Sequence, residues 1–230
     1  MIEGRKALRR LPALVILARH PDAGKVKTRL AASIGDAAAA ALYRAFLFDL
    51  GRKLAAHPGW VLYWAVAPAD SPLPLDIADG EKTFPQVGGD LGERMAGAIE
   101  RVLAEGHPSA VLIGADVPHV SITTLEEAFR CVAAGAKLVL GPAEDGGYYL
   151  VGASSLPPVF CDIRWGTTGV LTETIAAARR AGIEPALVAP DYDIDDREDL
   201  ERLKAEIQTR RIRDLQATEA ELARQNVHSL

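Results

Sequence analysis

The sequence predicts an α/β fold in which a mostly parallel central sheet is covered by helices on both faces. Short apolar runs, such as residues 14–18 and 110–114, are typical of buried strands. Between such runs lie longer segments in which apolar residues recur every three or four positions, as they do in helices. Because strands that alternate with helices usually pair in parallel, this order favours a sheet between two helical layers.

The first third of the chain is expected to form strands at 14–18 and 60–66 with two helices between them. The first helix begins near Thr28, which we expect to cap it, and a glycine interrupts it. Asp36 is then the expected cap of a second helix through an alanine-rich stretch, because alanine is the best helix former. The segment 68–80, rich in proline and aspartate, is predicted to be a surface loop.

The same alternation continues to the C-terminal part. Further strands are expected at 82–87, 110–114, 137–140, 148–151 and 185–188. Further helices are expected at 91–105, 121–134, 168–181 and from 197 onward. Ser121 or Thr123 is the expected cap of the helix at 121–134. After Thr209 two alternatives stay open: an extra helix that docks on a partner subunit, or a frayed end.

Length and composition favour a single domain at 13–208, with an N-terminal extension at 1–12 and a helical tail at 209–230. The chain has 230 residues, long enough to bury a core. Its net charge of −5 argues against nucleic acid or anionic membrane as general partners. No apolar run approaches membrane-spanning length, so no membrane insertion is expected. Cys131 and Cys161 match no metal or redox spacing, which indicates reduced thiols in a cytoplasmic protein.

A basic loop follows the first strand. Lys25, Lys27 and Arg29 alternate along the segment that opens a helix, where free backbone N–H groups also point outward. This arrangement predicts a cradle for an oligophosphate. The loop is not a Walker A motif, because Val26 stands where serine or threonine must bind magnesium and Arg19 stands where the first glycine belongs. The alternative is a solvated basic turn.

A glycine-rich turn precedes the helix at 91–105. Gly88 and Gly89 free the backbone, and Gln86 offers an amide to a base or hydroxyl. Arg94 lies one turn inside the helix. The segment predicts part of a nucleotide pocket, and the alternative is a plain strand-to-helix turn capped by Asp90.

Carboxylates follow two of the predicted strands. Asp116 stands at the end of the central strand, facing the crevice where such sheets bind ligands. Its carboxylate suits Mg²⁺, and the alternative is an Asx turn. Four acids occur between 191 and 196, and alternation places Asp193 and Asp195 on one side. One of these two is expected to complete a metal site with Asp116, and Asp195 or Asp196 is expected to cap the last helix.

The segment 141–150 combines two acids, two glycines and two tyrosines after an apolar strand. Gly146 and Gly147 are expected to let the backbone approach a ligand closely. Glu144 and Asp145 are the candidates for holding a metal or a ribose. The tyrosines are expected to restart a strand.

The ordered set of these motifs resembles a bacterial family of glycosyltransferase-like proteins with the GT-A, or nucleotide-diphospho-sugar transferase, fold. Members are associated with radical-SAM and selenium-related gene neighbourhoods, and the family is similar to guanylyltransferases that act on 2-phospho-lactate or the molybdenum cofactor. The likeness covers about residues 13–204 and includes Trp165 and Thr167. The chain departs from the pattern at Asp22-Ala23, His20 and Ala115.

The resemblance implies a three-layer α/β/α fold and a transferase that depends on Mg²⁺ or Mn²⁺ and uses a nucleotide-sugar donor and a small-molecule acceptor. It implies that the basic loop, Gln86, Gly89, Asp90 and Arg94 bind the nucleotide. The implied metal ligands are Asp116, Asp195 and Asp193, and the implied catalytic residues are Asp116, Asp145 and Glu144. The implied substrate contacts are Gly146, Gly147, Tyr148, Trp165 and Thr167.

Several alternatives stay open from the sequence. A nucleotidyltransferase that joins an NTP to a phosphorylated acceptor and releases pyrophosphate is the second hypothesis. A non-catalytic nucleotide-binding scaffold that assembles through its charged C-terminal helix, for example as a homodimer, is the third. Neither the donor, the acceptor, the stereochemical outcome nor the choice between Glu144 and Asp145 follows from the residues.

Overall fold

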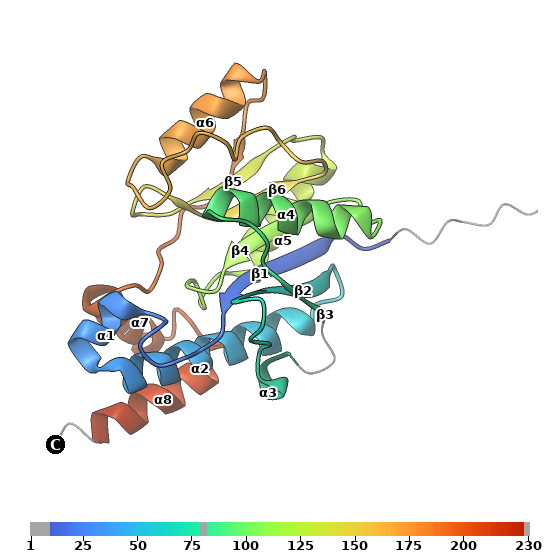
Figure 1. The fold of residues 1–230 in the computed structure, drawn as a ribbon. Coiled ribbons are helices and arrows are strands. Elements are labelled where there is room, and N and C mark those ends of the chain that lie inside the picture. Colours follow the sequence, from blue (N-terminus) through green and yellow to red (C-terminus); the bar gives the residue numbers. More distant parts are fainter. Residues whose placement is uncertain (1–9, 79–81, 228–230) are drawn as a thin grey trace, which may run out of the picture.

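The computed structural model describes residues 10–78 and 82–227, which form a seven-stranded sheet with helices on both faces (Figure 1). The strands are β1 (Ala13–Arg19), β2 (Val61–Ala67), β3 (Lys82–Pro85), β4 (Ala110–Gly114), β5 (Val139–Pro142), β6 (Tyr148–Ala153) and β7 (Ala186–Leu187). The helices are α1 (Thr28–Ile34), α2 (Asp36–Ala55), α3 (Leu75–Ala78), α4 (Leu91–Ala104), α5 (Ile122–Ala133), α6 (Val170–Arg180), α7 (Arg197–Gln208) and α8 (Gln216–Val227).

The prediction of a mostly parallel sheet is confirmed. The strand order is β3-β2-β1-β4-β6-β5-β7, and β6 is antiparallel to both of its neighbours. The other pairs run in parallel. Because β6 runs backwards between β4 and β5, the tight turn at 143–147 lies at the edge where the parallel strands end.

Alternate residues of the central strands serve two separate cores, as a sheet covered on both faces requires. Leu14 and Ile16 of β1 pack with residues from α1, α2, α5, α7 and α8. Ala13 and Val15 pack with residues from α4 and α6. The predicted three-layer α/β/α arrangement is therefore confirmed, and Figure 1 shows α6 and α8 on opposite sides of the sheet.

The predicted helix caps are confirmed at three of the five places where they were expected. Asp90, Ser121 and Asp196 each accept a backbone N–H bond at the start of α4, α5 and α7. The expectation for Thr28 and Asp36 is wrong. Both are already the first helical residue, and neither residue before them makes a side-chain cap.

The segment 68–80 is not only a surface loop. It contains α3, and Leu73 and Ile77 are buried against the α2 side of the sheet. Residues 79 and 80 of this segment lie outside the described residues, as do residues 1–9 of the predicted N-terminal extension.

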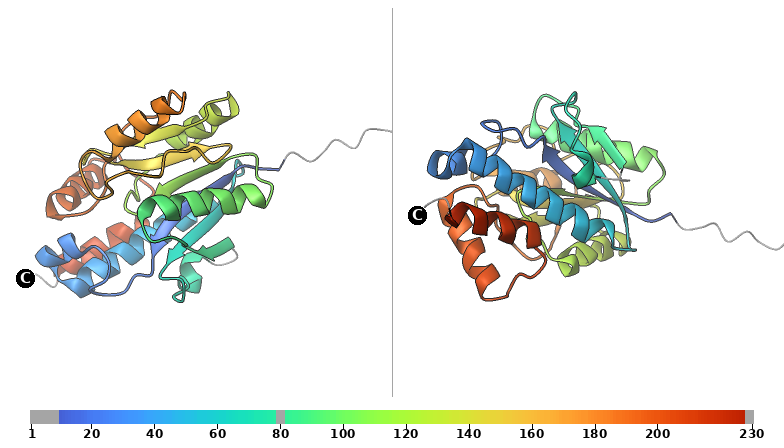
Figure 2. Two further views of the ribbon diagram at one scale, coloured as in Figure 1. Left: turned by 45° about the horizontal axis from the view of Figure 1, so that its top comes forward. Right: turned by 90° about the horizontal axis from the view of Figure 1, so that it is seen from below.

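The predicted C-terminal tail contains a helix, α8, which packs along α2 of the same chain (Figure 2). Leu215 and Leu222 are buried in the shared core. Residues 228–230 lie outside the described residues, and a homodimer through this helix stays a prediction. Among the described helices, none has the length and hydropathy to cross a membrane.

Candidate functional site

The sequence motifs meet at one edge of the sheet, where the parallel strands end. The chain leaves β1 to build β2 and β3 on one side, and then β4 on the other. The switch point therefore lies between β1 and β4, which is where open α/β sheets bind ligands. The basic loop after β1 and Asp116 after β4 stand at this point, and the loops at 143–147 and 188–196 lie at the same edge.

Lys27 is the centre of the candidate site. Its side chain is only 3% exposed, and its ammonium contacts Asp116 as well as Asp195, the latter at 3.1 Å. Burial alone would lower the pKa of Lys27, but the two carboxylates outweigh it and raise the pKa. Its backbone has φ 49°, a left-handed conformation that costs a non-glycine residue free energy and often marks functional sites.

Two aspartates near Lys27, Asp195 and Asp193, have pKa values shifted in opposite directions. The pKa of Asp195 is lowered, because Lys27 and Arg29 outweigh the effect of burial. Burial, followed by the charges of Asp116 and Asp195, raises the pKa of Asp193 to about 7. This shift shows that the pocket resists a further negative charge.

The other two cations of the basic loop differ from Lys27. Lys25 is 70% exposed, with Asp22 3.2 Å from its ammonium, and Arg29 is 65% exposed and paired with Asp195. The three cations of the predicted phosphate cradle therefore lie in different surroundings. Lys25 and Arg29 face solvent, whereas the Lys27 ammonium is paired with carboxylates.

The glycine-rich turn before α4 contributes mainly to the fold. The Gln86 amide donates to the carbonyls of Ala18 and Ala65, so its donors bridge β1 and β2. Gly89 N–H donates to Glu93, and Asp90 caps α4. The capping alternative for Asp90 is confirmed, and its contact with a nucleotide stays a prediction.

Arg94 lies at the same turn, where its Nε donates to Gly88 O at 3.2 Å. Val87 and Leu91 beside it are exposed, at 71% and 46%. This turn therefore presents apolar side chains, a guanidinium and backbone at the edge of the site, a mixture that suits a nucleoside.

In the turn between β5 and β6, Asp145 and Glu144 have different surroundings. Asp145 is exposed, accepts the N–H of Gly147 at 2.8 Å, and adds to the negative potential at Asp193. Gly146 has φ 90°, and a Cβ on it would lie 2.1 Å from the carbonyl oxygen of Thr168. The need for glycine at 146 is thus explained by the fold, and the predicted ligand role of Gly146 and Gly147 is not required to explain it.

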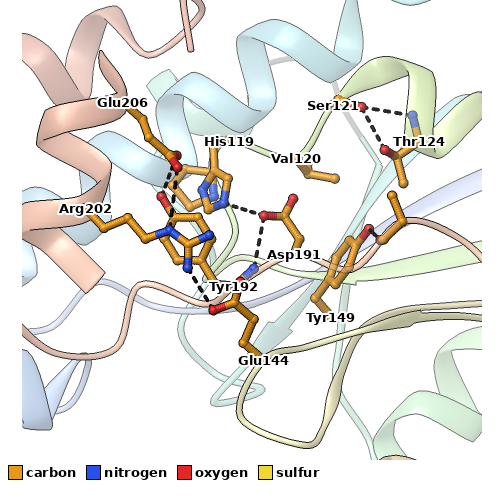
Figure 3. Close-up of polar contacts among 12 residues, drawn as sticks. His119, Val120, Ser121, Thr124, Glu144, Tyr149, Asp191, Tyr192, Arg202 and Glu206 are labelled. Carbon is orange, nitrogen blue, oxygen red and sulfur yellow. Dashed lines mark hydrogen bonds and ion pairs between the residues drawn. The ribbon is translucent and has the colours of Figure 1, made fainter. Parts of the chain in front are cut away.

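Glu144 belongs to a stacked cluster that sequence reasoning missed (Figure 3). It pairs with Arg202 at 2.8 Å, and the Arg202 guanidinium lies 3.6 Å from the centre of the Tyr192 ring. The His119 ring packs on Tyr192 at 4.3 Å between ring centres. His119 Nε2 lies 2.8 Å from Asp191 Oδ1, and its Nδ1 is buried without a hydrogen-bond partner among the described residues. The cluster ties together the loops after β4, β5 and β7.

Tyr148 and Trp165 lie on the α4 side of the edge. Their rings meet edge to face at 6.3 Å, and Trp165 packs against Gly92 in the first turn of α4. The Trp165 indole nitrogen is buried with no hydrogen-bond partner in the described part of the chain. Thr167 is exposed and donates to Arg164 O at 2.9 Å.

Metal binding at this site stays a prediction, and the residues present can be compared with what a divalent ion needs. Within residues 10–78 and 82–227, no three His, Cys, Asp or Glu side chains form a ready group for a metal ion. Asp116 and Asp195 nevertheless converge on one cation, the Lys27 ammonium, and their oxygens are the hard ligands that Mg²⁺ prefers. The donor set fits a divalent ion on condition that the ammonium moves aside.

Comparison with solved structures places the fold beside nucleotide-using enzymes. A crystal structure from Desulfovibrio desulfuricans G20, described as a "putative nucleotide-diphospho-sugar transferase", is 32% identical, covers 93% of this chain and 96% of its own, and has a TM-score of 0.82. A 4-diphosphocytidyl-2C-methyl-D-erythritol synthase is 12% identical, with coverages of 86% and 99% and a TM-score of 0.52. A cytidylyltransferase from Leptospira borgpetersenii serovar Hardjo-bovis is 13% identical, with coverages of 96% and 96% and a TM-score of 0.53. The last two show likeness of fold alone.

Comparison with curated proteins gives no match. A family model matches residues 50–167, which include the glycine-rich turn, Asp116 and the turn between β5 and β6. With that match and the 32% identity to the Desulfovibrio protein over nearly the whole chain, this protein belongs to the bacterial family described as "Uncharacterized protein conserved in bacteria (DUF2064)".

Proposed function

We propose that this chain is a metal-dependent glycosyltransferase that uses a nucleotide-sugar donor and a small-molecule acceptor. The observation that carries the proposal is the convergence of Lys27, Asp116 and Asp195 at the switch point of the sheet, beside the exposed Lys25 and Arg29. The 32% identical Desulfovibrio protein, whose description names nucleotide-diphospho-sugars, supports the donor class.

The charges around Lys27 suit a metal–diphosphate pair. Asp116, Asp193 and Asp195 carry three negative charges when ionised, against two positive charges from Lys27 and Arg29. Burial and, after it, the charges of Asp116 and Asp195 raise the pKa of Asp193, and a divalent ion would neutralise the surplus negative charge. Asp116 and Asp195 would hold Mg²⁺ or Mn²⁺, with Asp193 beside them. The bound ion would stabilise the charge that develops on the departing diphosphate.

The cations have complementary roles in this proposal. Lys25 and Arg29 reach solvent and would bind the diphosphate oxygens as point charge and planar donor. Lys27 is the resting counter-ion of the carboxylates and would turn to a phosphate when the metal ion arrives. Gly89, Asp90 and Arg94 would line the nucleoside end of the crevice, where Gln86 fixes the strands beneath it.

The acceptor would lie on the side of the turn between β5 and β6. Asp145 is the better candidate for a reacting carboxylate, because it is exposed and influences Asp193. Glu144 is engaged by Arg202, which favours a supporting role. Tyr148, Trp165 and Thr167 would form the wall beyond Gly146 and Gly147.

A nucleotidyltransferase is the second candidate, because two exposed cations at the switch point would also suit a triphosphate. Product identity separates the two. Release of a nucleoside diphosphate from a nucleotide-sugar supports glycosyl transfer, whereas release of pyrophosphate from an NTP supports nucleotidyl transfer.

The test is a thermal-shift screen of nucleotide-sugars and NTPs with Mn²⁺ or with EDTA, followed by product analysis of the ligands that bind. A ligand at 100 times its Kd is expected to add about 2.7 kcal/mol of stability. Asp116→Asn should abolish the Mn²⁺-dependent part of the shift. Asp76→Asn, an exposed acid paired with Arg44, should leave it unchanged. A shift that persists in Asp116→Asn would contradict the metal role of Asp116.

A further inference from the structure

Lys53 of α2 is half-buried, and its ammonium reaches the loop that follows Asp116. Its ammonium donates to the carbonyl oxygens of Pro118 and Val120, both at 2.8 Å. Burial lowers the pKa of Lys53 to about 8, even though nearby acids oppose the shift. Taking a charge partly out of water costs free energy unless hydrogen bonds compensate for it. Here they hold the main chain directly after Asp116.

The same loop is held from its other side by the segment at 191–194. The backbone N–H of Ile194 donates to Asp116 O at 2.9 Å. His119 contacts Asp191 and packs on Tyr192, as Figure 3 shows. Residues 116–120 therefore lie between the 191–194 segment and Lys53.

One turn before Lys53, Asp49 holds the start of the C-terminal helix. The Asp49 carboxylate is buried, and it accepts the N–H groups of Ala217 and Thr218 at 3.0 and 2.9 Å and the Thr218 hydroxyl at 2.7 Å. Residues four apart lie on the same face of a helix. Asp49 also acts on Lys53 electrostatically, as do Asp214, just before α8, and Asp191 at the site edge.

We propose that Asp49 and Lys53 couple the docking of α8 to the position of residues 116–120, so that Lys53 is a positioning residue for Asp116 and the C-terminal helix supports the candidate site from a distance. The coupling itself rests on the contacts above and on the placement of Asp49 and Lys53 four residues apart on one face of α2. Its effect on metal binding rests on the proposed function.

Hydrogen exchange of the full-length protein at pH 7 tests the coupling. The probes are the amides of Val120 and Ile194, which bond within and onto the loop, and the amides of α8. Asp49→Asn keeps the side-chain shape but removes its charge, and is expected to speed exchange about tenfold both in α8 and at Val120 and Ile194. Lys53→Met should have the same effect at Val120 and Ile194.

Arg52→Ala is the matched control. Arg52 lies between the two residues in sequence and contacts Gln216 of α8 on the exposed side, at 2.5 Å. Its replacement should change exchange in α8 at most. The coupling is overturned if Asp49→Asn speeds exchange in α8 alone. Because Asp49→Asn is nearly isosteric, it decides the question even if Lys53→Met does not fold.

A second readout separates this proposal from the proposed function. Direct Mn²⁺ titration of the folded variants should show about tenfold weaker affinity in Lys53→Met, as for residues that support metal ligands. A merely structural role would lower the melting temperature without this change. If exchange shows the coupling but Asp116→Asn binds Mn²⁺ like the wild type, the coupling stands and the metal role of Asp116 falls.

Discussion

Replacing Gly146 by alanine should destabilise the fold more than the same change at Gly182. Both glycines have left-handed backbones, with φ 90° and 71°. At Gly182 an added Cβ meets nothing within 4 Å, whereas at Gly146 it would lie 2.1 Å from the carbonyl oxygen of Thr168. The pair of variants therefore separates backbone strain from a steric clash.

The expected magnitudes follow from these two effects. A left-handed conformation costs an L-residue roughly 1–2 kcal/mol. Overpacking against a backbone that cannot move freely adds about 1–3 kcal/mol. Gly182→Ala should thus lose about 1–2 kcal/mol, and Gly146→Ala about 2–5 kcal/mol.

Urea denaturation followed by circular dichroism measures both losses, and unchanged m-values would show that only the midpoint has moved. If Gly146→Ala costs no more than Gly182→Ala, the turn between β5 and β6 does not press on Thr168. The glycine at 146 would then need another reason, such as close approach of a ligand.

Three further predictions concern charged groups. In EDTA, Asp193→Asn should be more stable than the wild type at pH 8 by up to about 4 kcal/mol, and equally stable near pH 3. The folded pKa of Asp193 is raised to about 7, so the wild type loses stability as the pH rises from the unfolded pKa to pH 7. Equal denaturation midpoints of the two proteins at pH 8 would refute this. The folded pKa of Lys53 is lowered to about 8 from 10.5. The stability of the wild type relative to Lys53→Met should therefore rise above pH 8, by up to about 3 kcal/mol near pH 10.5. A stability difference between the two proteins that stays constant from pH 7.5 to 9.5 would count against this. Glu144→Gln should change stability by less than about 1 kcal/mol, because the ion pair of Glu144 with Arg202 is exposed. The same variant should retain the donor turnover that Asp145→Asn loses. The reverse order of activities would make Glu144 the reacting acid.

Much of the fold could be predicted because local signals agree with it. The apolar runs at 14–18 and 110–114 are strands that are buried except at Leu17 and Gly114, which are partly buried, and the caps Asp90, Ser121 and Asp196 act as predicted. The orientation of β6 had no such signal, since a strand reads the same in either direction. The helix α3 was missed because it is one turn long and lies among prolines.

The site was predictable as a set of motifs and not as a set of contacts. Lys27 was predicted as one of three cations that cradle an oligophosphate, yet its side chain is buried and pairs with acids that lie far along the chain, Asp195 being 168 residues away. His119, Arg202 and Lys53 belong to no motif, and only the folded chain shows what they touch. A faint signal existed for His119, which follows Asp116 by three residues on the exit from the central strand.

The reversed strand β6 also determines where this fold can accept new sequence. The turn at 143–147 joins two neighbouring strands and is fastened by backbone bonds from Glu144 to Asp191, from Ala143 to Gly147 and from Leu171 to Gly146. An inserted residue would break these backbone hydrogen bonds and shift β5 relative to β6. The connection at 154–169 is longer, mostly exposed, and carries Trp165 and Thr167 to the same edge. Under the proposed function, libraries that aim to change acceptor preference should therefore vary the length of 154–169 and leave the turn at 143–147 untouched.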